Sequence, residues 1–458
     1  MNVLLINPGW MIREGNIWKK ISGSMPPLGI AYIASYLAAK SINVRIIDVQ
    51  AEKLPVEQLL DTVTGPPDYI GITATTMTVK SALATASLCR ARFPSSKITM
   101  GGVHPTIMPE DVLISPDVDY VIRGEGEIHF FELISGLETA SIKGLSYKKD
   151  GKFIHNPDGA LISDLDSLPF PAYNLLPVKN YVPTLGSYKR LPAISIITTR
   201  GCPGKCTFCL GSYLGGKVRM HSTRYIIDEI KMLIRDYGIR EISFYDDTFT
   251  AYRNKVRDFC NIIIEEKIDI TWSCFARVDF VDGDILRLMK ASGCHQIMYG
   301  IESGSNEILR NIKKKTSLEK AVEIVAITKK IGIECRAAFM LGNPGETLQT
   351  MKQTLDFAKR LDPDIALFNI TTPYPGTEMY DWAGKNGYLK TKDWSRYDLS
   401  TAVMELPGLK SVEVEEFYKK AHHEFYGRPS YLIKRLFKIR SFNELLIAVK
   451  GAIAVFSR

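Results

Sequence analysis

Residues 193–209 read AISIITTRGCPGKCTFC, an apolar run followed at once by Cys202, Cys206 and Cys209. The run 193–198 is typical of a buried strand. The spacing C-x3-C-x2-C then predicts three thiols on one loop at the carboxyl end of that strand. Thiolates are the usual protein ligands of iron–sulfur clusters, and a tight loop brings all three to one centre. Three ligands on a four-iron cluster leave one iron open for a small molecule.

A structural zinc site is the alternative, and it normally needs four ligands. His221 is a candidate fourth ligand, but it lies 12 residues beyond Cys209 and is typical of a surface or turn residue. The remaining cysteines stand singly in apolar patterns, where small buried side chains are the usual interpretation. They are Cys89, Cys260, Cys274, Cys294 and Cys335.

Short apolar runs alternate with helical periods on the carboxyl side of this loop. Six β/α units predict a partial or full barrel over 191–394, with its chemistry at the carboxyl ends of the strands. The expected strands are 193–198, 241–245, 270–275, 296–301, 334–341 and 365–369.

The same alternation precedes the loop and predicts a doubly wound α/β domain over 1–140. Residues 141–190 differ, because Asp150-Gly151 is typical of a hairpin turn and a proline-rich stretch follows it. We interpret 141–190 as a linker with a hairpin and 395–458 as a helical tail. The predicted fold class is α/β throughout, apart from that tail.

Composition excludes several classes of protein. The chain has 458 residues, of which 45% are hydrophobic and 24% charged, so neither wholesale disorder nor a disulfide miniprotein fits. Sparse cysteines and the lack of a signal peptide predict the reducing cytoplasm. Residues 428–458 hold seven basic residues and one acidic residue, a large part of the net charge of +8. This pattern suggests an amphipathic helix that touches an anionic membrane or a lipid-like substrate, or else a solvated helix that caps the barrel.

The cysteine loop, with Phe208 before its last cysteine, resembles the hallmark of the radical S-adenosylmethionine (radical SAM) enzymes. The resemblance implies that the three cysteines hold a [4Fe–4S] cluster. It implies that the open iron binds S-adenosylmethionine and that one electron cleaves this molecule to methionine and a 5′-deoxyadenosyl radical. It further implies contacts to S-adenosylmethionine from Phe208, Asp246, Asp247, Arg277, Glu302, Ser303 and Gly342.

Each of these contacts has a plainer alternative. Asp246-Asp247 replaces the commoner Gly-Gly-Glu pattern, and an aspartate before a helix often caps free N–H groups. Arg277 suits a carboxylate, but an ordinary ion pair also explains it. Glu302 resembles a ribose-binding carboxylate, and a structural role is its alternative. Gly342 opens a Gly-Asn-Pro-Gly-Glu turn, which resembles the turn that lies against adenine in the family, and a plain strand-to-helix turn is its alternative.

Joined to this barrel, the amino-terminal domain is similar to the cobalamin-binding domain of the cobalamin-dependent branch of the family. Gly101-Gly102 matches the branch's glycine pair, whereas the D-x-H-x-x-G loop that carries a cobalt ligand is absent after the first strand. His104 is a candidate replacement, although a histidine in a turn is the plainer interpretation. The resemblance implies cobalamin contacts from Asn7, Thr73, Thr75, Gly101, Gly102, Val103, His104, Gly124 and Glu125.

The resemblance implies methylation of an unactivated carbon in a small-molecule or lipid-like substrate, with an external electron donor such as flavodoxin or ferredoxin. Oxidative cyclisation or rearrangement of a porphyrin- or lipid-like substrate is the alternative. A protein that modifies or binds RNA is an alternative of another class. The sequence argues against it, because the first 190 residues hold a single cysteine and the tail is helical rather than a small β-barrel.

Overall fold

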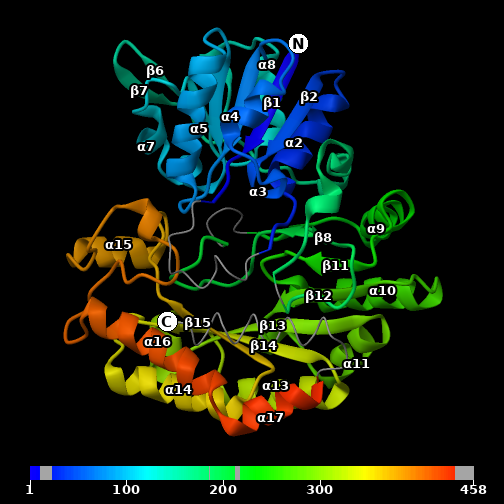
Figure 1. Ribbon diagram of the computed structural model, residues 1–458, viewed down its shortest axis with the longest axis vertical. Helices are drawn as coiled ribbons and strands as arrows, with labels where there is room; N and C mark the ends of the chain where they lie inside the picture. The colour runs from blue at the N-terminus through cyan, green and yellow to red at the C-terminus, as the bar shows by residue number, and fades with distance from the viewer. Residues whose placement is uncertain (11–22, 185, 212–216, 439–458) are drawn as a thin grey trace. The chain divides into compact units, whose positions relative to one another are not determined.

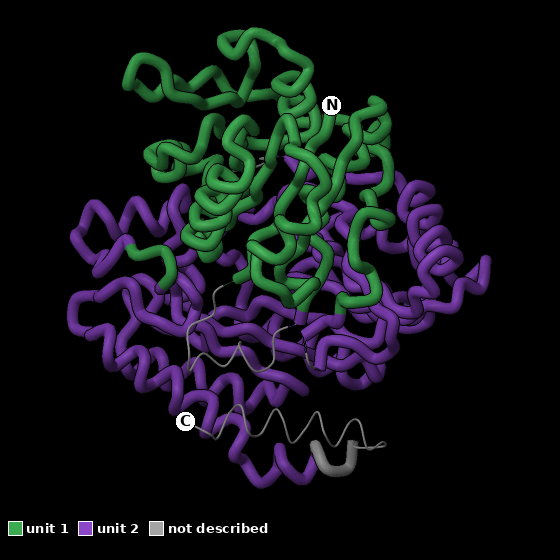
Figure 2. The backbone as a smooth tube through the Cα atoms, turned by 45° about the horizontal axis from the view of Figure 1, so that its top comes forward, with its two compact units in different colours: residues 1–11, 24–181, 393–395 green, residues 12–23, 182–392, 396–458 purple. Residues whose placement is uncertain are grey.

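The computed structural model describes residues 1–10, 23–184, 186–211 and 217–438. The chain forms two compact units, shown in different colours in Figure 2. Unit 1 comprises 1–11, 24–181 and 393–395, and unit 2 comprises 12–23, 182–392 and 396–458. Each unit is built around one mainly parallel β-sheet.

Unit 1 contains a seven-stranded sheet in the order β2-β1-β3-β4-β5-β6-β7. The first five strands are parallel, which confirms the expected doubly wound fold. Helices cover both faces of the sheet (Figure 1), with α2 (Leu28–Ala38) beside α8 (Gly126–Ile134) and α4 (Val56–Asp61) beside α5 (Val79–Arg92). The parallel strands are β1 (Asn2–Asn7), β2 (Asn43–Asp48), β3 (Tyr69–Thr73), β4 (Lys97–Gly101) and β5 (Tyr120–Ile122).

The strand order of unit 1 places a switch point between β1 and β3. The chain leaves β1 for β2 on one side and then returns to β3 on the other. In open parallel sheets of this kind, ligands bind beyond the carboxyl ends of the strands that flank such a point. Asn7 and Thr73 are the last residues of these two strands.

The hairpin predicted at Asp150-Gly151 is present, but it does not stand in a linker. Strands β6 (Leu145–Lys149) and β7 (Lys152–His155) extend the sheet of unit 1, where β6 pairs antiparallel with β5. A linker interpretation is natural from the sequence, because nothing local signals the pairing between β5 and β6. Figure 1 shows the hairpin at the edge of the sheet.

Unit 2 contains a six-stranded, wholly parallel sheet in the order β15-β14-β13-β12-β11-β8. In the described residues β8 and β15 remain edge strands, so the barrel is partial. The strands are β8 (Ala193–Ile196), β11 (Glu241–Phe244), β12 (Thr271–Ala276), β13 (Cys294–Glu302), β14 (Glu334–Leu341) and β15 (Ile365–Ile370).

Helices follow these strands and cover the outer face of the sheet (Figure 1). The outer face is apolar, and Phe244 and Trp272 pack there against Phe259 of α10. The inner face carries polar residues as well, including Ser243 and Ser273. The helices are α9 (Thr223–Tyr237), α10 (Arg253–Glu265), α11 (Gly283–Ala291), α13 (Leu318–Ile331) and α14 (Leu348–Leu361).

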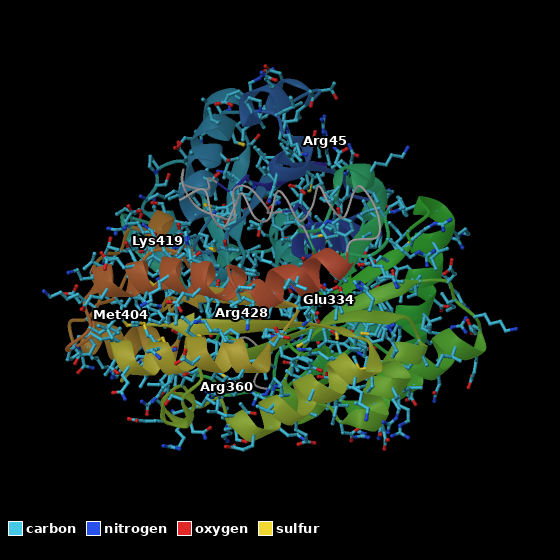
Figure 3. The ribbon with its side chains drawn as sticks, turned by 60° about the horizontal axis from the view of Figure 1, so that its bottom comes forward. Arg45, Glu334, Arg360, Met404, Lys419 and Arg428 are labelled. Atoms are coloured by element: carbon cyan, nitrogen blue, oxygen red, sulfur yellow. The ribbon has the colours of Figure 1, made fainter. Side chains whose placement is uncertain are left out.

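The described part of the predicted tail, residues 395–438, contains the helices α16 (Ser411–Tyr426) and α17 (Pro429–Lys438), and α15 (Glu378–Lys385) precedes it. Arg428 lies at the junction of α16 and α17 (Figure 3) and donates a hydrogen bond to the backbone oxygen of Lys359 at 2.8 Å. Lys434 of α17 pairs with Asp362 at 3.0 Å. These two basic residues therefore hold α17 against unit 2. The remainder of the predicted basic helix, 439–458, lies outside the described residues.

In the described ranges, no helix combines the length and the apolar character needed to cross a membrane.

Candidate cluster and cofactor sites

The residues that precede the cysteine loop are held in place by a buried aspartate that follows the neighbouring strand. Asp246 lies two residues beyond the end of β11, and its carboxylate accepts hydrogen bonds from the backbone N–H groups of Thr198 at 2.5 Å and Thr199 at 2.9 Å. The Thr198 hydroxyl donates to the same carboxylate. These three hydrogen bonds give Asp246 a role in positioning the loop, and its predicted contact with S-adenosylmethionine stays a prediction.

Two of the three thiols accept hydrogen bonds from backbone N–H groups of the loop itself. Gly204 donates to Cys202 Sγ, and Gly211 donates to Cys209 Sγ, both at 3.4 Å. Asp247 faces the same loop, since its Oδ2 lies 3.3 Å from the position that a Cβ on Gly211 would take. Asp247, unlike Asp246, is exposed. The predicted aspartate pair therefore divides into one residue that positions the loop and one that faces it.

The third thiol, that of Cys206, accepts a hydrogen bond from a positively charged side chain. Arg277, just beyond β12, donates from Nη1 to Cys206 Sγ at 3.7 Å and pairs with Asp279 at 2.9 Å. Burial raises the pKa of the Cys206 thiol, while the positive charges of Lys314 and Arg277 lower it. Hydrogen bonds and positive charges at sulfur favour the thiolate, which is the form that binds iron.

Next to the Cys206–Arg277 contact lies a buried ion pair that could not be predicted from the sequence. Lys314 donates to Glu302 at 2.7 Å, and less than a tenth of either side chain is exposed. Arg277 also donates to the backbone oxygen of Lys314 at 2.5 Å. Glu302, Lys314 and Arg277 therefore form one charged cluster, which we call the acid–base cluster.

Glu302 reaches this position through unusual backbone geometry. Its φ is 69°, in the left-handed region that non-glycine residues seldom adopt, and the register of β13 and β14 shifts between Gly300 and Glu302. Such an irregularity re-aims a side chain at the end of a strand. Ser303, predicted with Glu302, instead packs inside the fold, where its Oγ lies 3.2 Å from Thr354 Oγ1.

Phe208 follows a residue, Thr207, whose backbone N–H and oxygen are both hydrogen-bonded to other parts of unit 2. The Thr207 N–H donates to the oxygen of Ile312 at 3.1 Å, and the Met379 N–H donates to the oxygen of Thr207 at 2.9 Å. The ring of Phe208 packs against the apolar cluster of Leu309, Ile312 and Met379.

The predicted turn at Gly342 closes on a buried carboxylate. Gly342 has a φ of 84°, and its N–H donates to Glu346 Oε2 at 2.6 Å, as does the Asn343 N–H at 2.7 Å. Burial raises the pKa of Glu346 to about 8, although these hydrogen bonds lower it. The carboxyl group is thus mostly protonated at neutral pH.

His221, the candidate fourth ligand of a zinc site, is buried and stacks on Tyr225 with ring centroids 3.9 Å apart. Over the described ranges, no three side chains of His, Cys, Asp or Glu are grouped as ligands of a single metal ion.

In unit 1 the candidate site depends on backbone geometry at the switch point. Gly102 has a φ of 99°, and a Cβ there would lie 2.7 Å from the oxygen of Ala74 and 2.9 Å from Thr73 Oγ1. A side chain is therefore excluded where the loop after β4 passes the end of β3. Gly101 has no such restriction, because its Cβ would meet only the oxygen of Ile122, at 3.6 Å.

The side chains predicted around this point have partners within unit 1. Asn7 donates to Asp48 at 2.9 Å, and Glu125 accepts from the Ile162 N–H at 2.7 Å. Tyr181 donates to the other oxygen of Asp48 at 2.8 Å, a contact that the sequence analysis missed because 133 residues separate the two.

The predicted residues of the loops after β3, β4 and β5 differ in exposure. Thr75 and Val103 are exposed, and Gly124 has a φ of 80° with open space around it. His104 is buried, with Nδ1 3.2 Å from Thr76 Oγ1 and Nε2 3.5 Å from Asp111. Its ring is thus enclosed by unit 1, as expected for a packed turn histidine.

Comparison with known proteins gives matches along nearly the whole chain. Residues 196–358 match the model of the Radical SAM superfamily, and residues 17–134 match that of the B12 binding domain. An uncharacterized methyltransferase of Pyrococcus horikoshii is 37% identical over 463 residues, covering 100% of this chain and 99% of the relative. The anaerobic magnesium-protoporphyrin IX monomethyl ester cyclase of Rubrivivax gelatinosus is 26% identical over 445 residues, covering 94% of this chain and 78% of the relative.

Among solved structures, the methyltransferase TsrM from Kitasatospora setae, with cobalamin and a [4Fe–4S] cluster bound, superposes with a TM-score of 0.73. The match covers 99% of both chains at 16% sequence identity. It confirms the predicted order of a Rossmann-like domain followed by a barrel.

Proposed function

The chain belongs to the radical SAM enzymes that carry a B12 binding domain, and from this premise we propose that it is a methyltransferase acting on an unactivated carbon of a small molecule. The cofactors of such an enzyme are a [4Fe–4S] cluster, S-adenosylmethionine and cobalamin. The observation that carries the proposal is the loop 202–209, whose three thiols each accept a hydrogen bond from the surrounding structure.

We assign Cys202, Cys206 and Cys209 as the cluster ligands. When bound, the cluster and S-adenosylmethionine supply the radical that removes a substrate hydrogen, and cobalamin supplies the methyl group. The residues of the chain hold these groups in place. The hydrogen bonds at sulfur stabilise the thiolates, and Asp246 fixes the strand end from which the loop departs.

Five residues of unit 2 are proposed to bind S-adenosylmethionine. Asp247 suits its ammonium group, and Arg277 suits its carboxylate. Glu302 is proposed to accept hydrogen bonds from the ribose, with Lys314 pairing with that carboxylate at 2.7 Å. Phe208 and Gly342 are proposed to lie beside the adenine. Ser303 is assigned to packing, because it is wholly buried against Thr354.

In unit 1 we propose that cobalamin lies over the switch point. Gly101, Gly102 and Gly124 let the backbone approach a bulky ring, since glycine adds no side chain there. Asn7, Thr73, Thr75, Val103 and Glu125 stand at neighbouring strand ends and remain proposed contacts. His104 is proposed to support the loop from beneath, because Thr76 and Asp111 hold its ring.

The proposal is tested by anaerobic purification and cluster reconstitution, followed by the visible spectrum and by measuring 5′-deoxyadenosine under reductant. Replacing Cys202, Cys206 and Cys209 by Ala should remove the four-iron signal, and the buried Cys260→Ala should leave it unchanged. A four-iron signal in the triple variant would refute the ligand assignment. A purified protein that takes up no cobalamin would refute the role of unit 1.

Oxidative cyclisation is a second candidate, favoured by the similarity to the cyclase of Rubrivivax gelatinosus along 94% of the chain. S-adenosylmethionine with a labelled methyl group separates the two reactions. A methyltransferase places the label in its product, and a cyclase does not.

We propose a cytoplasmic location, an external electron donor of the flavodoxin or ferredoxin type and no role in binding nucleic acid. None of the eight cysteines forms a disulfide in the structure, in keeping with a reducing compartment. Membrane contact through 439–458 remains a prediction from the sequence.

A further inference from the structure

The inner face of the sheet in unit 2 is more exposed than its outer face. Along β12 and β15 the residues alternate between partly exposed and buried, and the buried set faces the helices. Trp272 and Phe368 belong to that buried set and pack against Phe259 and Phe425. The inner side chains of a filled barrel form a packed core. Partial exposure of the inner set therefore indicates that the inner face is accessible.

One row of residues crosses this inner face in hydrogen-bonded register. Phe275 of β12 is level with Met298 of β13, which is level with Arg336 of β14. Tyr245, at the end of β11, continues the row, since its ring meets Phe275 edge to face at 5.7 Å. Tyr245 is 42% exposed. The row therefore runs from an exposed aromatic ring, across apolar side chains, to an arginine.

Arg336 is buried with little to balance its charge. It is 9% exposed, and it donates a hydrogen bond from Nη1 to the side-chain oxygen of Gln296 at 3.3 Å. Its Nε has no hydrogen-bond partner. Within the described ranges no carboxylate forms an ion pair with it, and Glu334 on the same strand influences it only at longer range. Burial lowers the pKa of Arg336 from its usual value.

A buried, unpaired guanidinium is costly unless an anion meets it, and its planar fork of donors suits a carboxylate or a phosphate. Ser195 Oγ and Asn369 Oδ1 are among the other buried polar atoms of unit 2 that have no hydrogen-bond partner in the described residues. Ser195 is level with Ser243 on the inner face. The inner face thus combines apolar walls with unsatisfied polar groups, as binding sites for small molecules do.

We propose that Arg336 binds a carboxylate or phosphate group of the substrate at the inner face of the barrel, with Met298, Phe275 and Tyr245 contacting an apolar body. This proposal rests on the proposed function, since it names the substrate class of that same barrel. Arg336 and Phe275 are two strand spacings apart, roughly 10 Å. Phe275 lies two residues before Arg277, which contacts Cys206.

The test measures binding to the anaerobically reconstituted holoenzyme by calorimetry, with octanoate, octyl phosphate and octanol as probes. The wild type should bind one or both anions more tightly than octanol, and the better anion identifies the chemical source of the charge. Arg336→Gln removes the charge but keeps a donor toward Gln296. It should weaken anion binding about ten- to a hundred-fold and leave octanol binding unchanged.

Two further variants separate binding from folding. Arg336→Lys keeps the charge and should retain part of the preference for anions. Arg224→Gln removes an exposed arginine that pairs with Asp228, and it should change nothing. If Arg336→Gln does not fold, the comparison of Arg336→Lys with the wild type decides, because only loss of the bidentate fork distinguishes these two.

The proposal is overturned if the wild type binds no anion better than octanol, if anion binding is equal in the wild type and both Arg336 variants, or if Arg336→Gln weakens S-adenosylmethionine binding instead. Failure of the proposed function looks different. In that case 5′-deoxyadenosine does not form in the wild type, whatever the probes show.

Discussion

The carboxyl ends of the two parallel sheets form their candidate sites in different ways. In unit 2 the geometry is made by side chains, with Asp246 holding the cysteine loop and Lys314 pairing with Glu302. In unit 1 it is made by the backbone, and Gly102 matters because any side chain there would collide with the end of β3. A site made by side chains, as in unit 2, can be recognised from a pattern of residue types in the sequence. A site made by the backbone, as in unit 1, is marked mostly by glycines.

The largest effect is expected from breaking the acid–base cluster in unit 2. Lys314→Met leaves Glu302 buried without its cation, which should cost about 3–5 kcal/mol of stability. The double variant with Glu302→Gln should regain much of this loss, because no charge then remains unpaired. Thermal unfolding of the single and double variants measures the coupling. Equal stability of Lys314→Met and the wild type would show that the ion pair contributes nothing.

The next effect tests the buried carboxyl of the Gly342 turn. Glu346 has a pKa of about 8 in the folded chain, above its value of 4.5 when unfolded. Between these two values the folded state binds more protons, so the contribution of Glu346 to stability is full below about pH 4.5 and falls as the pH rises to about 8. Glu346→Gln cannot ionise and should flatten this fall by a few kcal/mol.

The measurement is the difference in unfolding free energy between the wild type and Glu346→Gln across that pH window. Other titrating groups contribute equally to both proteins and cancel. A difference that stays constant with pH would contradict the assignment of a neutral Glu346.

A smaller loss is expected in unit 1, where the two neighbouring glycines serve as variant and control. Gly102→Ala forces a side chain into a backbone conformation that essentially only glycine adopts, which should cost about 1–3 kcal/mol. Gly101→Ala meets only ordinary contacts and should be tolerated. Unfolding and cobalamin uptake are measured for both. Equal behaviour of the two variants would remove the backbone argument for unit 1.

The smallest change in stability is expected for Asp247→Asn. Asp247 is exposed beside the cysteine loop, so the substitution should alter stability by less than about 0.5 kcal/mol. It should still weaken S-adenosylmethionine binding, measured by equilibrium dialysis of the holoenzyme. Asp246→Asn, made for comparison, should lower stability by more than Asp247→Asn does, because Asp246 holds Thr198 and Thr199.

The sequence predicted the strands of both sheets and the cysteine loop, because apolar periodicity and cysteine spacing are local signals. It did not predict Lys314, since a bulge and a left-handed residue bring Glu302 to it. It did not predict that Gly101 and Gly102 have different roles, nor that Asp246 and Asp247 do. Adjacent residues of the same type differ only in their surroundings in the folded chain. The pairing of β6 with β5 was missed because nothing in the local sequence signals which strand β6 pairs with.

The hydrogen bonds from Thr198 and Thr199 to Asp246 have a consequence for how the enzyme is assembled. Zinc fingers fold only when their metal binds, so metal supply and folding are a single event for them. Here, hydrogen bonds between the ends of two adjacent strands hold the start of the metal-binding loop, and none of the groups that form them is a proposed iron ligand. We therefore expect folding and iron delivery to be separable steps.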